Sequence, residues 1–244
     1  MEEPDALFAD ARLASLYDAL EGDRDDLDVY AAIVVELDAR SVLDVGSGTG
    51  TFAHLLADRG NEVVAVEPAG ASLAVARTKP GAERVRWIHG DATTLPDLQV
   101  DLATMTANVA QVFTTDDAWA ANLAGIAAAV RPGGHLVFET RVPARRAWER
   151  WNPTDSFQIV EDDERGPVAS WHEVTDVDLP LVTFRSTIRF DRTGEEVVSS
   201  STLRFRERDE IEASLEAARF RTVDVRNAPD RPGLEWVFVA RRQS

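Results

Sequence analysis

Residues 41–50 of this 244-residue chain read SVLDVGSGTG, and residues 51–59 continue as TFAHLLADR. The first apolar run predicts a short buried strand, and the second segment has apolar residues at helical spacing. Three glycines at alternate positions lie between the two segments, and glycine allows the backbone to turn tightly and to approach a ligand closely. The stretch therefore predicts a strand, a ligand-binding loop and a helix whose free N–H groups face that loop.

The residues around the glycines narrow the choice of ligand. A dinucleotide-binding loop reads Gly-x-Gly-x-x-Gly or Ala, but Thr51 occupies the last of these positions. The Gly-Lys-Ser/Thr ending of a phosphate-binding P-loop is absent from this stretch. Asp44 lies at the end of the predicted strand, where its carboxylate would repel a pyrophosphate and attract an ammonium and a sulfonium. These features favour S-adenosylmethionine.

Four segments in order resemble the motifs of the class I S-adenosylmethionine-dependent methyltransferases of the small-molecule type. Residues 43–50 (LDVGSGTG) resemble the first motif, and residues 63–67 (VVAVE) form a second buried strand that ends in an acid. Residues 89–92 (HGDA) follow a predicted third strand, and residues 131–138 (RPGGHLVF) resemble the family's Pro-Gly-Gly turn into the fifth strand. The resemblance covers residues 40 to 142.

This resemblance implies a set of contacts for the cofactor and the acceptor. Glu67 would accept both ribose hydroxyls, Asp91 would meet the adenine amino group, and residues 105–111 would hold the methionine amino group and face the acceptor. The implied cofactor contacts are Tyr17, Asp44, Gly46, Ser47, Gly48, Gly50, Glu67, Pro68, Asp91, Ala92, Thr106 and Asn108. The implied substrate contacts are Asn108, Gln111, Trp171, His172 and Arg185. S-adenosylhomocysteine would be the product.

Strands and helices alternate through the central part of the chain, which predicts a parallel sheet with right-handed crossovers. We expect strands at 41–45, 62–67, 84–89, 100–105 and 134–140, and helices at 51–59, 70–78 and 116–130. With the resemblance, the predicted fold is α/β: a Rossmann-like seven-stranded, mainly parallel sheet with helices on both faces, plus an inserted antiparallel β region. Ligands of such sheets bind at the carboxyl ends of the strands.

Three regions are predicted along the chain. Residues 1–40 are predicted to be helical, with a polar break at 21–26. The resemblance implies that this segment is a lid over the cofactor and includes Tyr17. The alternative is that Tyr17 and Tyr30 pack between helix and sheet. Residues 41–145 and 207–244 form the cofactor domain, which ends in a helix and a reversed strand hairpin. Residues 146–206 alternate apolar and polar positions, as antiparallel strands do, and the resemblance implies that this insert binds the substrate.

Composition excludes several classes of function. The net charge of −17 disfavours an extended nucleic-acid surface, which depends on clustered Lys and Arg. The chain has no cysteine, so disulfides, thiolate catalysis and cysteine zinc sites are excluded, and its four scattered histidines predict no metal.

No apolar run of about 18 residues occurs and the N-terminus is acidic, so we expect a cytoplasmic protein without a membrane partner. The arginine-rich, alanine-rich composition indicates a high-GC genome and a bacterial source. Both a monomer and a homodimer remain open.

Methyl transfer from a sulfonium needs mainly the alignment of donor and acceptor, and no enzyme nucleophile is required. A general base is needed only for a hydroxyl, a phenol or a protonated amine, and the candidates are His172, Tyr17, His89, Glu139 or a carboxylate of the lid. The sequence thus predicts methyl transfer to the O or N of a small molecule. Methylation of protein or RNA, or a non-catalytic module that binds an adenosyl ligand, are the alternatives.

Overall fold

The computed structural model describes residues 4–244, so Met1, Glu2 and Glu3, the first part of the predicted lid, lie outside the described residues. The larger of two sheets has seven strands in the order β10-β11-β5-β4-β1-β2-β3. Its strands are β1 (Ser41–Val45), β2 (Glu62–Glu67), β3 (Val85–His89), β4 (Val100–Met105), β5 (Val130–Arg141), β10 (Phe220–Asn227) and β11 (Glu235–Arg242). β1 to β5 run parallel, whereas β11 pairs antiparallel with both β5 and β10, which confirms the predicted sheet.

Most strand bounds agree with the sequence expectation to within a residue, and β5 is the exception. The sequence predicts a start at residue 134, but the strand begins at Val130, because Val130 pairs with Val100 ahead of a shift in register. The preceding helix consequently ends at Ala129.

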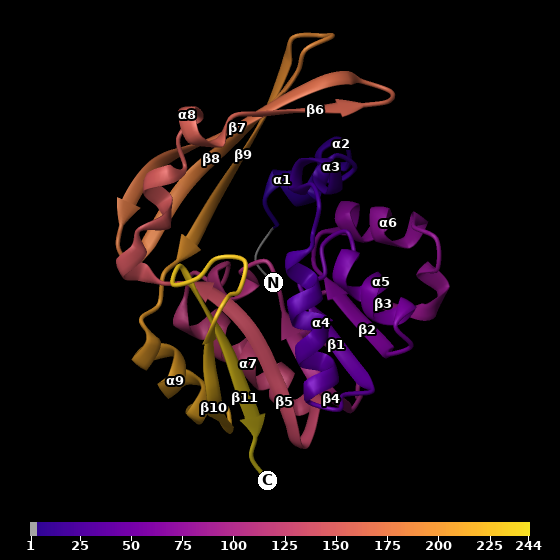
Figure 1. The fold of residues 1–244 in the computed structure, drawn as a ribbon, viewed down its shortest axis with the longest axis vertical. Coiled ribbons are helices and arrows are strands. Elements are labelled where there is room, and N and C mark those ends of the chain that lie inside the picture. The colour runs from indigo at the N-terminus through magenta and orange to yellow at the C-terminus, as the bar shows by residue number, and fades with distance from the viewer. Residues whose placement is uncertain (1–3) are drawn as a thin grey trace.

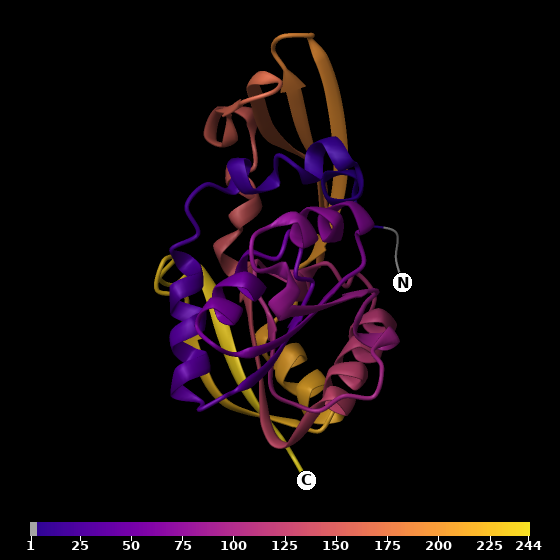
Figure 2. The ribbon, with the colours of Figure 1, turned by 90° about the vertical axis from the view of Figure 1, so that its right-hand side faces the viewer.

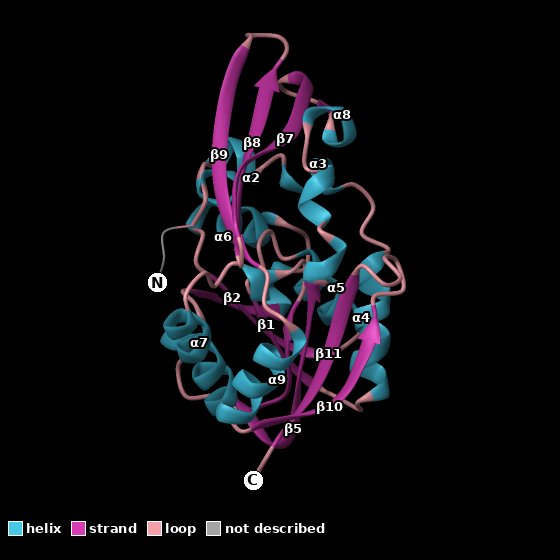
Figure 3. Ribbon diagram, turned by 90° about the vertical axis from the view of Figure 1, so that its left-hand side faces the viewer, coloured by secondary structure: helices cyan, strands magenta, loops and turns pink. Residues whose placement is uncertain are grey.

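Helices cover both faces of the main sheet (Figure 3). One face packs against α7 (Asp116–Ala129) and α9 (Arg208–Ala217), and the other against α4 (Asp26–Glu36) and α5 (Thr51–Asp58). The remaining helices are α1 (Ala6–Ala9), α2 (Ala11–Ala14), α3 (Tyr17–Glu21), α6 (Gly70–Thr78) and α8 (Pro153–Ser156). Within residues 4–244, none of the helices is long and apolar enough to cross a membrane.

The second sheet stands above the carboxyl edge of the main sheet, with α1, α2 and α3 between them (Figures 1 and 2). It is antiparallel in the order β6-β7-β8-β9, with β6 (Gln158–Asp162), β7 (Gly166–Asp178), β8 (Leu181–Phe190) and β9 (Glu195–Arg204). Leu13 and Leu16 of the helical segment pack against Val168 and Ile188 of this sheet. Burial of these apolar side chains joins the first helices to the inserted sheet.

One aromatic pair joins the reversed hairpin to the parallel strands. Phe138 of β5 and Phe238 of β11 are register partners, neither is exposed, and their rings stack 5.2 Å apart. Buried aromatic pairs add to the stability that area burial alone provides. The β5–β11 contact therefore depends strongly on these two side chains.

We expect Phe138→Ala to lower the free energy of unfolding by about 3–5 kcal/mol, because the cavity cannot collapse between paired strands. Urea denaturation of the purified protein measures the change. Phe157→Ala is the matched control, since the Phe157 side chain is 50% exposed and its loss should cost far less. Equal losses for the two variants would contradict the assignment of Phe138 to the core.

Candidate active site

Asp44 lies at the carboxyl end of β1 with 1% of its surface exposed. Its Oδ1 atom accepts a hydrogen bond from Thr104 Oγ1 at 3.2 Å, and its Oδ2 atom has no hydrogen-bond partner within residues 4–244. Burial raises the pKa of Asp44 to about 7; the Thr104 hydrogen bond opposes this shift and the charge of Glu67 adds to it. A cation beside Oδ2 would offset the cost of burying this carboxylate.

Glu67 ends β2 and is held by two backbone amides. Gly48 N–H donates to its Oε2 atom and Ala69 N–H to its Oε1 atom, both at 2.8 Å. Burial raises the pKa of Glu67, although these two hydrogen bonds lower it. Each carboxylate oxygen has a further lone pair, so the fixed carboxylate can accept two neighbouring hydroxyl groups.

The glycine loop approaches other parts of the protein at two of its three glycines. A Cβ on Gly46 would lie 2.7 Å from Val109, and one on Gly50 would lie 2.5 Å from Trp87. A Cβ on Gly48 would meet nothing within 4 Å, so the open side of the loop is at Gly48. Ser47 Oγ in the same loop is buried and lacks a hydrogen-bond partner among the described residues. Asp44 Oδ2 and Ser47 Oγ thus leave hydrogen-bonding capacity beside the loop, which fits a polar ligand.

Asp91 follows β3 and begins the short 3-10 helix Ala92–Thr94. Its Oδ1 atom accepts from Thr93 N–H at 2.9 Å and from Thr93 Oγ1 at 2.5 Å. Ala92 N–H donates to Asn122 Oδ1 at 3.2 Å, and the carbonyl of Pro68 lies 2.9 Å from His89 Nε2. The turns after β2 and β3 are therefore fixed by their own hydrogen bonds.

Asp18 of α3 joins the helical segment to the glycine loop. Its Oδ1 atom accepts from Thr49 Oγ1 at 2.5 Å, and its Oδ2 atom pairs with Lys79 Nζ at 2.5 Å. The neighbouring Tyr17 packs on Phe8, and its pKa is raised, first by burial and then by nearby acids that include Glu67. The contacts of Asp18 thus hold the helix that carries Tyr17 against the glycine loop. Sequence reasoning missed Asp18, because nothing distinguishes it from the other acids of the segment.

A buried polar cluster follows β4. Ala107 and Asn108 both have positive φ angles, 57° and 60°, and Asn108 N–H donates to Glu139 Oε1 at 2.7 Å. Asn108 Nδ2 donates to Glu235 Oε1 at 3.2 Å, and Arg141 Nη1 donates to Gln111 Oε1 at 2.9 Å. The predicted contacts Asn108 and Gln111 therefore share one cluster, whereas Thr106, also buried, lies just ahead of it.

Glu139 and Glu235 bring two acids into this cluster, each 3% exposed. Burial raises the pKa of Glu139 to about 7, and the charge of Glu235 adds to this shift. The hydrogen bond from Asn108 N–H and, more weakly, the nearby Tyr30 hydroxyl of α4 oppose it. Burial followed by the charge of Glu139 raises the pKa of Tyr30 in turn. Sequence reasoning missed Glu235 and Arg141. The signal that marks them is the presence of charged residues within otherwise apolar strands.

The predicted contacts in the inserted sheet lie on opposite faces. His172 packs edge-on against Phe184 at 5.8 Å, and its Nδ1 atom lies 2.9 Å from Ser186 Oγ. Phe184 contacts Trp151, whose ring Arg141 covers at 5.3 Å, so His172 is connected to the cluster after β4. Burial lowers the pKa of His172.

Trp171 and Arg185 lie on the other face of the sheet, because consecutive strand residues alternate. Trp171 stacks on Phe157 with Arg189 over its ring, and Arg185 pairs with Glu173. The structure therefore does not bring Trp171 and Arg185 together with His172 and the loop after β4.

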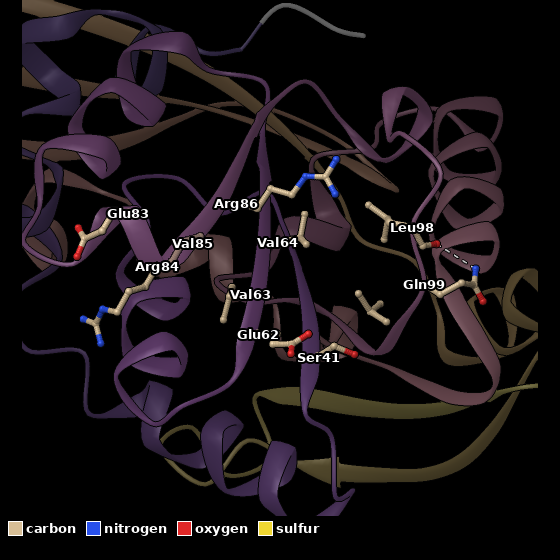
Figure 4. A pocket seen from close by; sticks show the side chains of 11 residues that line it. Ser41, Glu62, Val63, Val64, Glu83, Arg84, Val85, Arg86, Leu98 and Gln99 are labelled. Carbon is tan, nitrogen blue, oxygen red and sulfur yellow. Dashed lines mark hydrogen bonds between the residues drawn. The ribbon is translucent and has the colours of Figure 1, made fainter.

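A surface depression lies at the opposite edge of the main sheet (Figure 4). Ser41, Glu62, Val85 and Val100, the first residues of β1 to β4, contribute to its lining. Ligands of open α/β sheets bind at the carboxyl ends, and the acidic and unpaired groups described above gather there instead. Within residues 4–244, no group of three or more potential ligands could hold a metal ion.

Comparison with known proteins agrees with this geometry. Residues 42–134 match the family described as "Methyltransferase domain". A curated relative, the cypemycin N-terminal methyltransferase of a Streptomyces species, is 36% identical over 109 residues, which is 44% of each chain, so the match spans less than half of that relative. The structure of CalS10 with S-adenosylmethionine bound, an amino pentose methyltransferase from Micromonospora echinaspora, is 26% identical with a TM-score of 0.70, covering 92% of this chain and 94% of that one.

Residues 42–134 thus form a methyltransferase domain, and the chain has the fold of S-adenosylmethionine-dependent methyltransferases. The fold of the whole chain is shared with the CcbJ methyltransferase from Streptomyces caelestis, at 21% identity and a TM-score of 0.80 over 100% of both chains. The cofactor is therefore S-adenosylmethionine, and the residues at the carboxyl edge of the sheet have groups that fit it. The unpaired atoms Asp44 Oδ2 and Ser47 Oγ fit its polar methionine end, and the two fixed oxygens of Glu67 fit its ribose.

We expect Glu67→Ala to weaken S-adenosylmethionine binding to this methyltransferase at least tenfold, because the two ribose hydroxyls would lose their acceptor. Isothermal titration calorimetry measures the affinity. Glu62→Ala is the control, since Glu62 is the exposed first residue of the same strand. An unchanged affinity for Glu67→Ala would reject the assignment.

We expect Asp44→Asn to raise the stability of the cofactor-free protein at pH 8 while it weakens cofactor binding. The pKa of Asp44 is raised from 3.8 to about 7, so the folded state retains a proton that the unfolded state has lost. This group therefore makes stability fall as pH rises from about 4 to 7, and the difference between wild type and variant should grow over that range. Urea denaturation across pH measures it.

Asp101→Asn is the control with the opposite sign. Burial raises the pKa of Asp101, but hydrogen bonds from Arg131 and from Ser41 N–H outweigh it, and the pKa is lowered. That variant should lose stability at neutral pH. Equal effects of the two substitutions would contradict the role of burial at Asp44.

Proposed function

We propose that this methyltransferase transfers the methyl group of S-adenosylmethionine to the O or N of a small-molecule acceptor. The observation that carries the proposal is the set of acids at one edge of the sheet, two of which lie near the carboxyl ends of adjacent strands. Asp44 and Ser47 have unpaired atoms for the methionine end, and Glu67 has free lone pairs for the ribose. Asp91, with Ala92, is assigned to the adenine amino group.

The chemistry requires little from the protein beyond alignment. S-adenosylmethionine supplies an electrophilic methyl group and leaves as S-adenosylhomocysteine. The residues of this chain bind the two molecules, hold them in line and exclude water, which can supply much of the acceleration. The loop after β4, with Thr106, Asn108 and Gln111, is assigned to the sides of both ligands. The helical segment that carries Tyr17 would close over the cofactor through the Asp18 contacts with Thr49 and Lys79.

The inserted region, residues 146–206, is assigned to cover the acceptor. His172 would contact its polar part and the ring of Trp151 its apolar part. His172 can hold a proton at Nε2, since Nδ1 already faces Ser186. The names of two related proteins, an amino pentose methyltransferase and an N-terminal methyltransferase, support an acceptor with an accessible heteroatom. The net charge of −17 speaks against nucleic acid as the acceptor. A cytoplasmic location and a monomer or homodimer remain predictions from the sequence.

The test is product analysis with trideuteromethyl-labelled S-adenosylmethionine and an extract of small metabolites. We expect a small molecule to gain the label while S-adenosylhomocysteine forms in equal amount, and we expect Glu67→Ala to reduce both at limiting S-adenosylmethionine. Protein and RNA fractions of the same extract are assayed in parallel. Label in those fractions alone would favour the macromolecular alternatives, and tight cofactor binding without any labelled product would favour a binding module.

A further inference from the structure

An arginine at the end of the inserted region holds the loop after β4, residues 106–115. Arg206 Nη1 donates to the carbonyl oxygen of Ala110 at 3.4 Å, and its Nη2 atom donates to those of Phe113 at 2.8 Å and Thr115 at 3.2 Å. All three carbonyls belong to this one loop. A guanidinium can serve several acceptors at once, because its five N–H groups are fixed in one planar fork.

The Arg206 guanidinium is deeply buried. The residue is 4% exposed, and its Cζ atom lies 5.2 Å from the centre of the Trp119 ring. Asp116 Oδ1 is 3.9 Å from Arg206 Nη2, but this exposed acid lies closer to Arg204, at 2.9 Å. Burial lowers the pKa of Arg206 to about 10, so the side chain stays charged at neutral pH. The carbonyl dipoles and the aromatic ring therefore offset much of the cost of burying this charge.

Loop 106–115 has little regular structure to hold it in place. It contains the 3-10 helix Val109–Gln111, and Asn108 ahead of that helix has a left-handed backbone conformation. The two side chains assigned to the acceptor, Asn108 and Gln111, thus lie on a segment whose position depends on contacts from outside the loop. Arg206 supplies three of these contacts.

The two residues before Arg206 join the same loop to the cover over the acceptor. The carbonyl oxygen of Arg204 accepts from Gln111 Nε2 at 3.3 Å, so the backbone of this segment is also bound to the loop. Phe205 packs against Trp151 of the cover, with ring centres 6.1 Å apart. These three consecutive residues therefore contact both the loop and the inserted region.

We propose that Arg206 is a positioning residue for the methyl acceptor. By fixing loop 106–115 to the end of the inserted region, it sets the distance between the loop and the cover, and so the room for the acceptor between them. It acts through Asn108 and Gln111 and not by contact with the reacting atoms. The inference rests on the proposed function, because it takes the loop and the inserted region as two sides of the acceptor site.

Hydrogen exchange tests the hold on the loop without any acceptor. In Arg206→Ala we expect the amides of residues 107–115 to exchange at least tenfold faster than in the wild type, because the loop loses three outside contacts, and those of β1 and β2 to be unchanged. Guanidinium ion at low millimolar concentration should restore protection, since it can enter the space left by the side chain. Faster exchange throughout the main sheet, or no response to guanidinium, would show general support of the fold and overturn the inference.

Arg208→Ala is the matched control for the exchange experiment. The Arg208 side chain is 53% exposed and pairs with Glu212, so its loss should leave exchange in the loop unchanged with or without guanidinium. Arg206→Lys is the milder second variant, because an ammonium keeps the charge but lacks the planar fork that reaches three carbonyls. We expect intermediate exchange rates in its loop. If Arg206→Ala does not fold, wild-type exchange in Arg206→Lys would overturn the inference.

Kinetics then test the link to the acceptor. With the acceptor identified in the labelling experiment, we expect its kcat/KM to fall at least tenfold in Arg206→Lys, while the affinity for S-adenosylhomocysteine, measured by calorimetry, stays within threefold. Guanidinium should restore part of the activity of Arg206→Ala. Equal losses of acceptor kcat/KM and of cofactor affinity would assign the loop to the cofactor and overturn the inference. Failure of the wild type to methylate any acceptor counts against the proposed function, whereas a loop that stays protected in Arg206→Ala counts against this inference alone.

Discussion

Incomplete pairing of buried carboxylates is the constraint on which the rest of this structure depends. Asp44 and Glu139 each have one oxygen in a hydrogen bond and one without a partner among the described residues, and burial raises the pKa of both to about 7. Such groups destabilise the folded state at neutral pH, since a solvated carboxylate ionises far more easily. They persist because apolar packing elsewhere, such as the stacked Phe138 and Phe238, supplies the stability that they lack.

The sheet topology determines which side chains meet at this edge. Parallel strands β1, β2 and β4 end together, so Asp44, Glu67 and the loop after Met105 become neighbours although they are distant in sequence. The antiparallel strand β11 then enters from the opposite direction, and its first residue, Glu235, lies against Asn108. Asp18 closes the arrangement from the N-terminal segment through Thr49. A reversed strand and a short helix thus complete a site that parallel strands alone would leave open.

The parts that could be predicted from the sequence are those encoded locally. Apolar periodicity and the glycine spacing predict β1, the loop and α5, and the acid after β2 is recognisable because it ends an apolar run. The contacts of Asp18 and Glu235 could not be predicted, because each depends on a partner far away in the chain, and no local pattern marks the pairing. Alternation within a strand also separates neighbours: Trp171 and His172 are adjacent in sequence, yet they face opposite sides of the inserted sheet.

The identity of residue 139 follows from the same physical reasoning. Asn108 has a left-handed backbone conformation, and its N–H needs an acceptor beneath the loop. A glutamine at this position would satisfy that N–H without burying a charge, and so would be the more stable choice for a residue that only supports the loop. A carboxylate provides the same support and a second acceptor as well. The carboxylate also meets the Tyr30 hydroxyl of α4, so it links the loop after β4 to the helix that covers this face of the sheet.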